Sequence, residues 1–365
     1  MKRSLVVGLV LLAGLLVIPA GQPQAQDVYK FGLSSSLTGP LAVYGDTGRQ
    51  AIVMALEEIN AKGGVLGRKL EVISLDDQGV PTTHVSNVRR LISVDRVPVV
   101  FGSFTHLALA GIPVATETKV VYLTSLVTHP LVIKESPWAF SVSINLPKTA
   151  EYVTKVAWDR GVRKAVIMVN NAESPRRNGE VIEKTLKALG GEVLLHEVLP
   201  AGTDYRSTIL RMKAKNPDAV LSNSFVGPQA LFIKQMFELG WKVPFYATNP
   251  VEEDIFFKTV GDTADGVLYG SLAGDPKRWD DFRERFRAKY GVYPSTFDVQ
   301  HYDAAYVLAE AIKRGGYTAE GIRKALAEMK DFKGVGGSIT FGPERFPDLP
   351  LTLKIVKGRT YQFFK

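Results

Sequence analysis

The stretch that decides the fold is residues 29–64, which read YKFGLSSSLTGPLAVYGDTGRQAIVMALEEINAKGG. It begins with a short apolar run around Phe31 and Leu33, continues through a serine-rich loop, and passes into a helix that ends at Gly63 and Gly64. Glycine ends a helix easily because it takes the left-handed conformation without steric cost. The segment therefore predicts a strand, a polar loop and a helix, and the loop offers hydroxyls and free backbone N–H groups to a small polar molecule.

The same alternation of apolar runs and amphipathic helices continues along the chain. In the first helix, apolar residues recur at i, i+3, i+4 and i+7 and give a single apolar stripe. Further strands are predicted at residues 70–75, 97–101, 120–124, 165–169, 193–199, 219–222 and 243–246. Strands that alternate with helices form parallel sheets with helices on both faces, and ligands bind at the carboxyl ends of such strands. The pattern indicates an α/β fold in which two such sheets face one another across a cleft.

The N-terminus and the composition limit the class of protein. Residues 1–26 have the pattern of a cleaved secretion signal, because Lys2 and Arg3 precede an apolar run and a small-residue exit. We expect the mature chain in the periplasm. The sequence has no cysteine, which excludes disulfides, thiolate metal sites and lipidation of an N-terminal cysteine. The net charge of +8 is spread along the chain, so we expect no nucleic-acid binding.

Motifs for catalysis are missing from the sequence. The five histidines are scattered, no serine lies in a Gly-x-Ser-x-Gly turn, and no glycine-rich nucleotide-binding loop follows a strand. Adjacent acids occur at residues 76–77 and 252–254, and we interpret most of them as solvated, since such acids favour turns and first helical turns. We expect no enzymatic activity, no metal and no cofactor. The alternative is a hydrolase that uses Glu252 or Glu253 with a bound water.

Taken in order, several short motifs resemble the leucine/isoleucine/valine-binding family of periplasmic solute-binding proteins. The motifs are Leu37-Thr38-Gly39-Pro40, residues 58–64, Asp76-Asp77, Gly202-Thr203-Asp204-Tyr205, residues 216–220, Ala264-Asp265-Gly266-Val267 and Tyr302-Asp303-Ala304-Ala305. The resemblance implies a type I periplasmic binding fold, with two Rossmann-like lobes joined by three crossovers. It also implies the substrate-binding component of an ABC importer, expected to be a monomer that delivers its solute to permease subunits. A sensor of the same fold that acts in signalling is the alternative, and the absence of a signalling segment after the last residues favours transport.

The resemblance also assigns the C-terminal third. Helical patterns at residues 279–290, 297–314 and 319–329, and strands near 338–341 and 351–356, otherwise read as an appendage. In the family, the helices return to the first lobe and the last strand to the second. We therefore expect lobe 1 to comprise residues 27–143 and 274–341, and lobe 2 to comprise residues 144–273 and 342–365.

Two loops of lobe 1 and one tyrosine are candidate ligand contacts. The first loop carries Ser103, Phe104, Thr105 and His106 at the start of a helix, where hydroxyls can cap the helix and N–H groups can hold a carboxylate. In the family this loop normally has paired serines for the ligand carboxylate. His106 is either a donor to the ligand or an exposed helical residue.

The second loop follows the strand at residues 120–124. By resemblance to the family, Thr124, Val127 and Thr128 face the pocket, and Tyr44 lies over the ligand.

Lobe 2 contributes Ser174, Phe225 and Asn249 by the same resemblance. Asn249 stands where amino-acid-binding members place an acid for the ligand ammonium, and Ser174 or a neighbour replaces an expected tyrosine. An ammonium without an anion loses a charge-assisted hydrogen bond of roughly 1.5 to 3 kcal/mol. The sequence thus leaves two ligand classes open: an amino acid, branched-chain or other, and an aromatic or aliphatic carboxylate without the amine.

Overall fold

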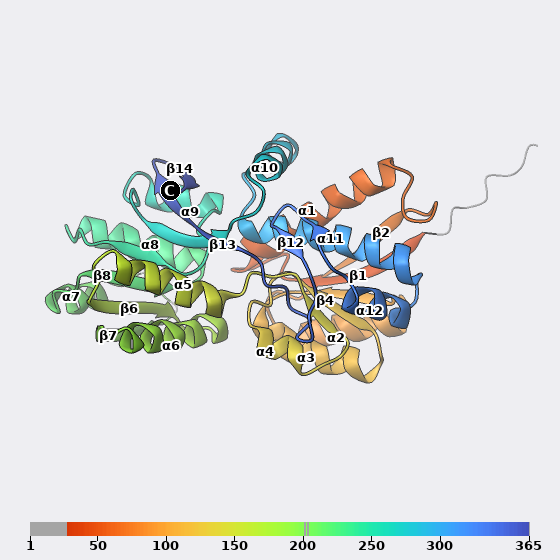
Figure 1. Ribbon diagram of the computed structural model, residues 1–365, viewed down its shortest axis with the longest axis horizontal. Coiled ribbons are helices and arrows are strands. Elements are labelled where there is room, and N and C mark those ends of the chain that lie inside the picture. The colour runs from red at the N-terminus through yellow and green to blue at the C-terminus, as the bar shows by residue number, and fades with distance from the viewer. Residues whose placement is uncertain (1–27, 201, 203, 365) are drawn as a thin grey trace, which may run out of the picture.

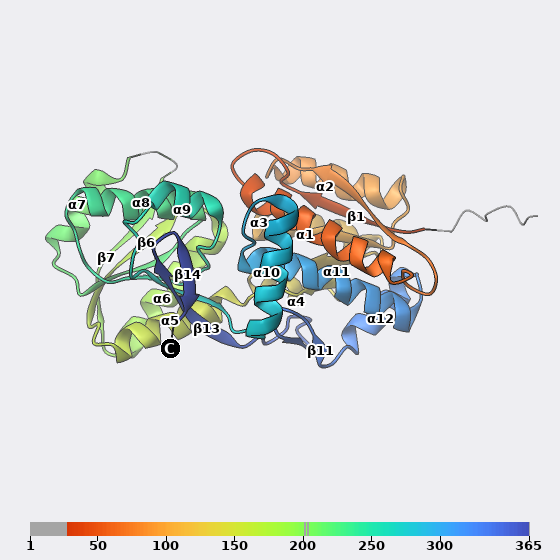
Figure 2. The ribbon, with the colours of Figure 1, turned by 90° about the horizontal axis from the view of Figure 1, so that it is seen from above.

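The computed structural model describes residues 28–200, 202 and 204–364, which form two lobes lying side by side (Figure 1). The predicted secretion signal lies outside the described residues. Each lobe is built on one sheet with helices packed around it, as Figure 2 shows from a second direction. The α/β class predicted from the alternation of strands and helices is confirmed. Within the described ranges, no helix is both long enough and apolar enough to cross a membrane.

The sheet of lobe 1 is entirely parallel, with the strand order β2-β1-β3-β4-β5. Its strands are β1 (Tyr29–Ser35), β2 (Leu70–Asp76), β3 (Val99–Gly102), β4 (Val121–Thr124) and β5 (Ala139–Ser141). The intervening helices are α1 (Ala42–Ala61), α2 (Pro81–Ser93), α3 (Thr105–Glu117) and α4 (Pro130–Lys134). The first strand, loop and helix thus fall within the stretch that the sequence assigned to them.

The sheet of lobe 2 has the strand order β14-β13-β10-β9-β8-β6-β7, and β13 runs antiparallel to both of its neighbours. Its strands are β6 (Lys164–Asn170), β7 (Glu192–Leu199), β8 (Ala219–Asn223), β9 (Phe245–Ala247), β10 (Leu268–Leu272), β13 (Leu351–Lys357) and β14 (Thr360–Phe363). Its helices are α5 (Leu146–Asp159), α6 (Glu173–Ala188), α7 (Arg206–Ala214), α8 (Val226–Glu238) and α9 (Asp254–Val260).

The chain passes between the two sheets three times. The first passage joins β5 to α5, and the second joins β10 to α10 (Pro276–Tyr290). Helices α11 (Thr296–Gly315) and α12 (Ala319–Ala327) then pack with lobe 1, where α11 lies against α1 (Figure 1). The small hairpin of β11 (Phe332–Lys333) and β12 (Ser338–Ile339) precedes the third passage, which leads to β13.

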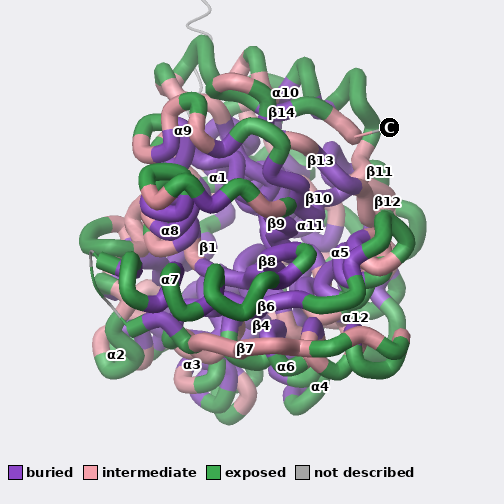
Figure 3. Tube along the Cα trace, turned by 90° about the vertical axis from the view of Figure 1, so that its left-hand side faces the viewer, coloured by how far each residue is buried: buried purple, intermediate pink, exposed green. Residues whose placement is uncertain are grey.

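Alternating residues of each strand face opposite sides of its sheet, so each sheet has a core on both faces. In β3, Val99 and Phe101 face the core shared with α1 and α11, whereas Val100 faces the core under α2 and α3. In β6, Val166 and Ile167 divide in the same way. Figure 3 shows the resulting pattern, with buried strands inside and exposed turns around them. Strands from both sheets end at the boundary between the two lobes.

Candidate ligand-binding site

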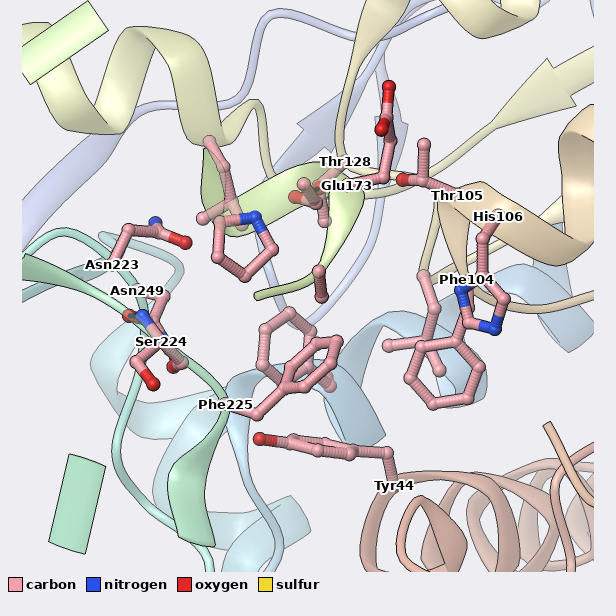
Figure 4. A pocket seen from close by; sticks show the side chains of 16 residues that line it. Tyr44, Phe104, Thr105, His106, Thr128, Glu173, Asn223, Ser224, Phe225 and Asn249 are labelled. Carbon is pink, nitrogen blue, oxygen red and sulfur yellow. Dashed lines mark hydrogen bonds between the residues drawn. The ribbon is translucent and has the colours of Figure 1, made fainter. Parts of the chain in front are cut away.

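A cavity lies between the lobes at the carboxyl ends of strands from both sheets (Figure 4). Its lining residues are Tyr44, Phe104, Thr105, His106, Leu126, Thr128, Leu146, Ala172, Glu173, Ser174, Pro175, Asn223, Ser224, Phe225, Asn249 and Phe297. The centres of water molecules can occupy ≈ 50 Å³ of this cavity. The cavity itself extends a water radius of ~1.4 Å beyond the space for these centres on every side, so it holds a molecule of roughly ten non-hydrogen atoms. The cavity therefore suits one small organic molecule.

Four aromatic rings form one side of the cavity, and they come from both lobes. The ring of Tyr44 lies 5.6 Å from that of Phe297, 6.0 Å from that of Phe104 and 6.1 Å from that of Phe225, measured between centroids. Phe104 and Phe225 are 6.4 Å apart at an interplanar angle of 78°. Edge-to-face contacts of this kind favour a further ring or an apolar chain placed among them.

Three helices begin at the cavity wall. The first residue of α3 is Thr105, the first residue of α6 is Glu173, and α8 begins directly after Phe225. The N-terminus of a helix carries roughly half a positive charge and unpaired N–H groups, so it favours an anion. Among the described lining residues there is no lysine or arginine. The positive potential at this site therefore comes from the backbone.

Two hydroxyls in the wall are buried without a partner. Thr105 Oγ1 and Ser224 Oγ have no hydrogen bond within residues 28–200, 202 and 204–364, and their residues are 4% and 1% exposed. A buried hydroxyl without a partner costs free energy, about 1 to 3 kcal/mol, unless a ligand or a water completes it. Each of these two groups is therefore available to a molecule in the cavity.

Thr105 does not cap its helix, although the sequence allowed it. The residue before α3 is Phe104, whose φ of 49° and ψ of 141° are unusual for a residue with a side chain, and no described side chain caps this helix. Such a backbone conformation costs on the order of 1 to 3 kcal/mol and is concentrated at functional sites. In Figure 4 the ring of Phe104 lies on the same side of the cavity as that of Tyr44.

The carboxylate in the wall and the amide of Asn249, one of two asparagines there, are already engaged. Glu173 accepts a hydrogen bond from Arg177 Nε at 2.6 Å, and it is the only acid among the described lining residues. Asn249 Nδ2 donates to the carbonyl oxygen of Ser224 at 2.7 Å and to that of Pro250 at 3.3 Å. Among the described lining residues, the cavity therefore offers an ammonium group no carboxylate that is both buried and unpaired.

His106 reaches the cavity wall from α3, and its Nε2 lies 3.2 Å from the carbonyl oxygen of Gly79. Burial lowers the pKa of His106 from its ordinary value of 6.5. The imidazole is therefore neutral near pH 7, where one ring nitrogen donates to Gly79.

Hydrogen bonds join the two lobes beside the cavity, and two of them involve residues at its wall or directly after it. The backbone N–H of Val226 donates to the Tyr44 hydroxyl at 2.8 Å, and Thr128 Oγ1 lies 3.2 Å from Ser174 Oγ. Each pair joins one residue from lobe 1 to one from lobe 2. The structure thus has the two lobes closed against each other.

Eight of the residues predicted from the sequence line this cavity, and three do not. The three that lie outside its wall are Ser103, Thr124 and Val127. Ser103 Oγ donates to Ser35 Oγ at 3.0 Å, and Thr124 Oγ1 accepts from the N–H groups of Leu126 and Val127. Val127 is fully buried in the core under α3. These side chains lie behind the cavity wall, where they support the two loops.

The interpretation of the paired acids as solvated is wrong for three of them. Asp77 is fully buried and accepts hydrogen bonds from Ser34 Oγ and Ser36 Oγ. Glu252 is also fully buried and pairs with Lys354 Nζ at 2.6 Å. Glu253 is 4% exposed. The local sequence around these acids indicated turns. It does not contain the partners of Asp77 and Glu252, which come from elements distant along the chain.

The sequence prediction missed several lining residues, above all Phe297 and Ser224. Ser224 directly follows β8, so the rule that ligands bind at strand ends could have found it. Phe297 is the second residue of α11, far from the other lining residues along the chain, and no local pattern marks it as a ligand contact.

The sequence model of the periplasmic binding protein family matches residues 28–349, so the chain belongs to this family. The Leu/Ile/Val-binding protein homolog 1 of Brucella abortus (strain 2308) is 26% identical over 358 residues, which cover 96% of this chain and 95% of the relative. The Leu/Ile/Val-binding protein BraC3 of Rhizobium johnstonii is 26% identical over 346 residues, covering 91% and 92%. The resemblance to the leucine/isoleucine/valine-binding family is confirmed.

Solved structures share the fold at low identity. LivJ of Streptococcus pneumoniae in complex with isoleucine has a TM-score of 0.83 at 23% identity, covering 93% of this chain and all (100%) of that one. A solute-binding protein of an ABC transporter from Rhodopseudomonas palustris BisB5, in complex with 3,4-dihydroxybenzoic acid, has a TM-score of 0.84 at 24% identity, covering 92% and 96%. The chain therefore has the type I periplasmic binding fold that the sequence predicted.

Proposed function

We propose that this protein is the extracytoplasmic solute-binding component of an ABC importer, and that its solute is a small aromatic carboxylate. The observation that carries the proposal is the cavity between the lobes, where aromatic rings on one side meet three helix N-termini and two free hydroxyls. A ring packs among the aromatic side chains, and the anion lies at the N–H groups and the Thr105 hydroxyl.

The engaged carboxylate and amide argue against an amino acid. An ammonium enclosed in this cavity finds Glu173 already paired with Arg177 and Asn249 already bonded to backbone carbonyls. It loses a charge-assisted hydrogen bond worth roughly 1.5 to 3 kcal/mol, which is about 10- to 150-fold in affinity. Among the structural relatives, LivJ binds isoleucine, whereas two proteins of Rhodopseudomonas palustris bind 4-hydroxybenzoate and benzoate. The wall of this cavity favours the second group of ligands.

Capture proceeds by closure of the lobes. In an open state the ligand contacts one lobe, through Thr105, Thr128 and the N-terminus of α3. In the closed state it also contacts the N-termini of α6 and α8 and Ser224 of the other lobe. A ligand that gains contacts only in the closed state shifts the population toward it. The bonds from Val226 N to the Tyr44 hydroxyl and between Thr128 and Ser174 then hold the lobes together.

The lobes that move correspond to residues 27–143 with 274–341 and to residues 144–273 with 342–365. We place the protein in the periplasm after removal of residues 1–26 and expect it to act as a monomer that presents its closed form to the permease. We expect no turnover of the bound solute, because no described side chain in the wall pairs a nucleophile with a base.

Calorimetric titration against two matched series of ligands tests the proposal. One series contains benzoate, 4-hydroxybenzoate and 3,4-dihydroxybenzoate, and the other contains leucine, isoleucine and valine. We expect at least one aromatic acid to bind more than tenfold tighter than any of the three amino acids. Tighter binding of an amino acid would contradict the assignment of the ligand class, and binding of neither series would contradict the proposed function.

A further inference from the structure

A second cavity between the lobes contains buried carboxyl groups that the proposed function does not use. It is lined by Val43, Thr47, Glu253, Asp254, Ile255, Lys258, Val292, Tyr293 and Asp298. Glu253 directly precedes α9 in lobe 2, whereas Asp298 lies in the first turn of α11, which packs on α1 in lobe 1. The two lobes thus bring one acid each to a shared space.

Both acids have oxygens without partners in the part of the chain that the structure describes. Glu253 Oε1 and Oε2 are buried and make no hydrogen bond, and the same holds for Asp298 Oδ1. The residues are 4% and 2% exposed. The other oxygen of Asp298 accepts from Ser295, both from its backbone N–H at 2.7 Å and from its hydroxyl at 3.0 Å. An ionised carboxylate buried without a donor or a cation is strongly unfavourable.

No basic side chain of the described residues forms an ion pair with Glu253 or Asp298. The charged and titratable groups around them are Glu252 on the same loop, Asp254 and Lys258 on α9, Tyr44 on α1, and Tyr293 before α11. The ring of Tyr293 in turn contacts Arg283 and Arg287 of α10, and the Asp46–Arg49 pair flanks Thr47 on α1. Glu252 is paired with Lys354, and Lys258 is paired with Asp254 at 3.9 Å while its side chain is 71% exposed. Among the described residues, no group of three or more metal-ligating side chains could hold a metal ion. A proton is the remaining way to neutralise the site.

We propose that Glu253 and Asp298 form a proton-binding site that is completed when the lobes close, so that ligand capture is coupled to proton uptake. The proposal rests on the proposed function, because it concerns closure of the same clamp. In the open state Glu253 faces water and ionises at its ordinary pKa, while in the closed state its carboxyl group is protonated. Affinity for the ligand is then higher at low pH and lower at high pH.

The direction of the pKa changes agrees with this geometry. Burial raises the pKa of Glu253 well above its ordinary value of 4.5, and the charges of Glu252 and Asp298 add to the effect, while the nearby backbone N–H groups of Glu253 and Glu252 oppose it. Burial likewise raises the pKa of Asp298 to about 6, against the opposing effect of donors from Ser295 and Thr47. A carboxyl group whose pKa is higher in the closed state stabilises that state. The stabilisation is complete below the open-state pKa, and it is lost as the pH rises through the closed-state pKa. Coupling of one proton makes the affinity fall up to tenfold per pH unit.

The test is calorimetric titration of benzoate from about pH 6.5 to about pH 8.5, where the affinity should fall as the pH rises, by up to tenfold per pH unit for one coupled proton. The carboxylate of benzoate stays ionised in this range, and burial keeps the pKa of His106 and His129 below 6.5. Glu253→Gln should remove most of the slope. Asp46→Asn is the control, since Asp46 is a partly exposed acid on α1 next to Thr47 and pairs with Arg49. It should keep the wild-type slope.

A second measurement uses the wild-type protein alone, in case Glu253→Gln fails to fold. Titrations of benzoate at pH 7 are repeated in buffers of different ionisation enthalpy. The measured binding enthalpy should depend on the buffer, which shows that the protein takes up a fraction of a proton when benzoate binds. A pH-independent affinity with no proton uptake overturns the coupling while leaving the proposed function intact. A slope that Glu253→Gln retains, or that Asp46→Asn also loses, overturns the assignment to this site. Absence of binding to benzoate and to the other aromatic acids at every pH contradicts the proposed function instead.

Discussion

Replacing Thr105 by valine removes one hydroxyl from the cavity wall and leaves the size of the side chain almost unchanged. Thr105 Oγ1 is buried and has no partner among the described residues. A hydrogen bond to an ionised group contributes about 1.5 to 3 kcal/mol, so Thr105→Val should weaken binding of benzoate by roughly 10- to 150-fold. The stability of the ligand-free protein should not fall, because no internal hydrogen bond is lost.

Calorimetry measures the affinity, and thermal unfolding without ligand measures the stability. Thr124→Val is the matched control, since Thr124 Oγ1 accepts hydrogen bonds from two backbone N–H groups and does not line the cavity. This control should lower the unfolding temperature, because it leaves those N–H groups without their acceptor. Wild-type affinity in Thr105→Val would refute the placement of the ligand anion at this loop.

Three further substitutions test other parts of the account. Phe104→Gly should unfold with a free energy about 1 kcal/mol higher than Phe104→Ala in chemical denaturation, because glycine accepts the φ of 49° at that position without strain; equal stabilities would argue against strain there. Tyr44→Phe removes the acceptor of the Val226 N–H and should weaken ligand binding by about 1 kcal/mol, or roughly fivefold, and an unchanged dissociation constant in calorimetry would contradict that role. Lys354→Met leaves Glu252 buried without its cation and should lower the free energy of unfolding by about 3 kcal/mol, which urea denaturation measures and which Glu252→Gln in the same chain should partly restore.

Local patterns in the sequence were sufficient for the framework of the fold. The strand, serine-rich loop and helix at residues 29–64 appear as β1 and α1, because alternation of apolar residues and a terminal glycine pair are local properties. The positions of the C-terminal helices came only from the family resemblance. The packing of α11 against α1 depends on contacts across more than two hundred residues, which no local pattern contains.

The candidate site was predictable where it follows strand ends and not where it depends on burial. Thr105, Phe104 and Thr128 lie in loops after β3 and β4 and do line the cavity. Val127 lies in one of the same loops but faces the core, because its backbone turns it inward. The adjacent acids at residues 252–254 indicated a solvated turn, since they follow one another in the sequence, and the packing of lobe 1 beside Glu253 is invisible in the local sequence.

Small-angle X-ray scattering with and without a bound aromatic carboxylate is the most direct test of the central claim, which is that two lobes close around a small anion. We expect the radius of gyration to fall when saturating benzoate, or whichever acid binds in the titration, is added to the ligand-free protein. Tyr44→Phe should need more ligand to reach the same contraction. Identical scattering curves for the free protein and the protein with its ligand bound would contradict a clamp that closes on its solute.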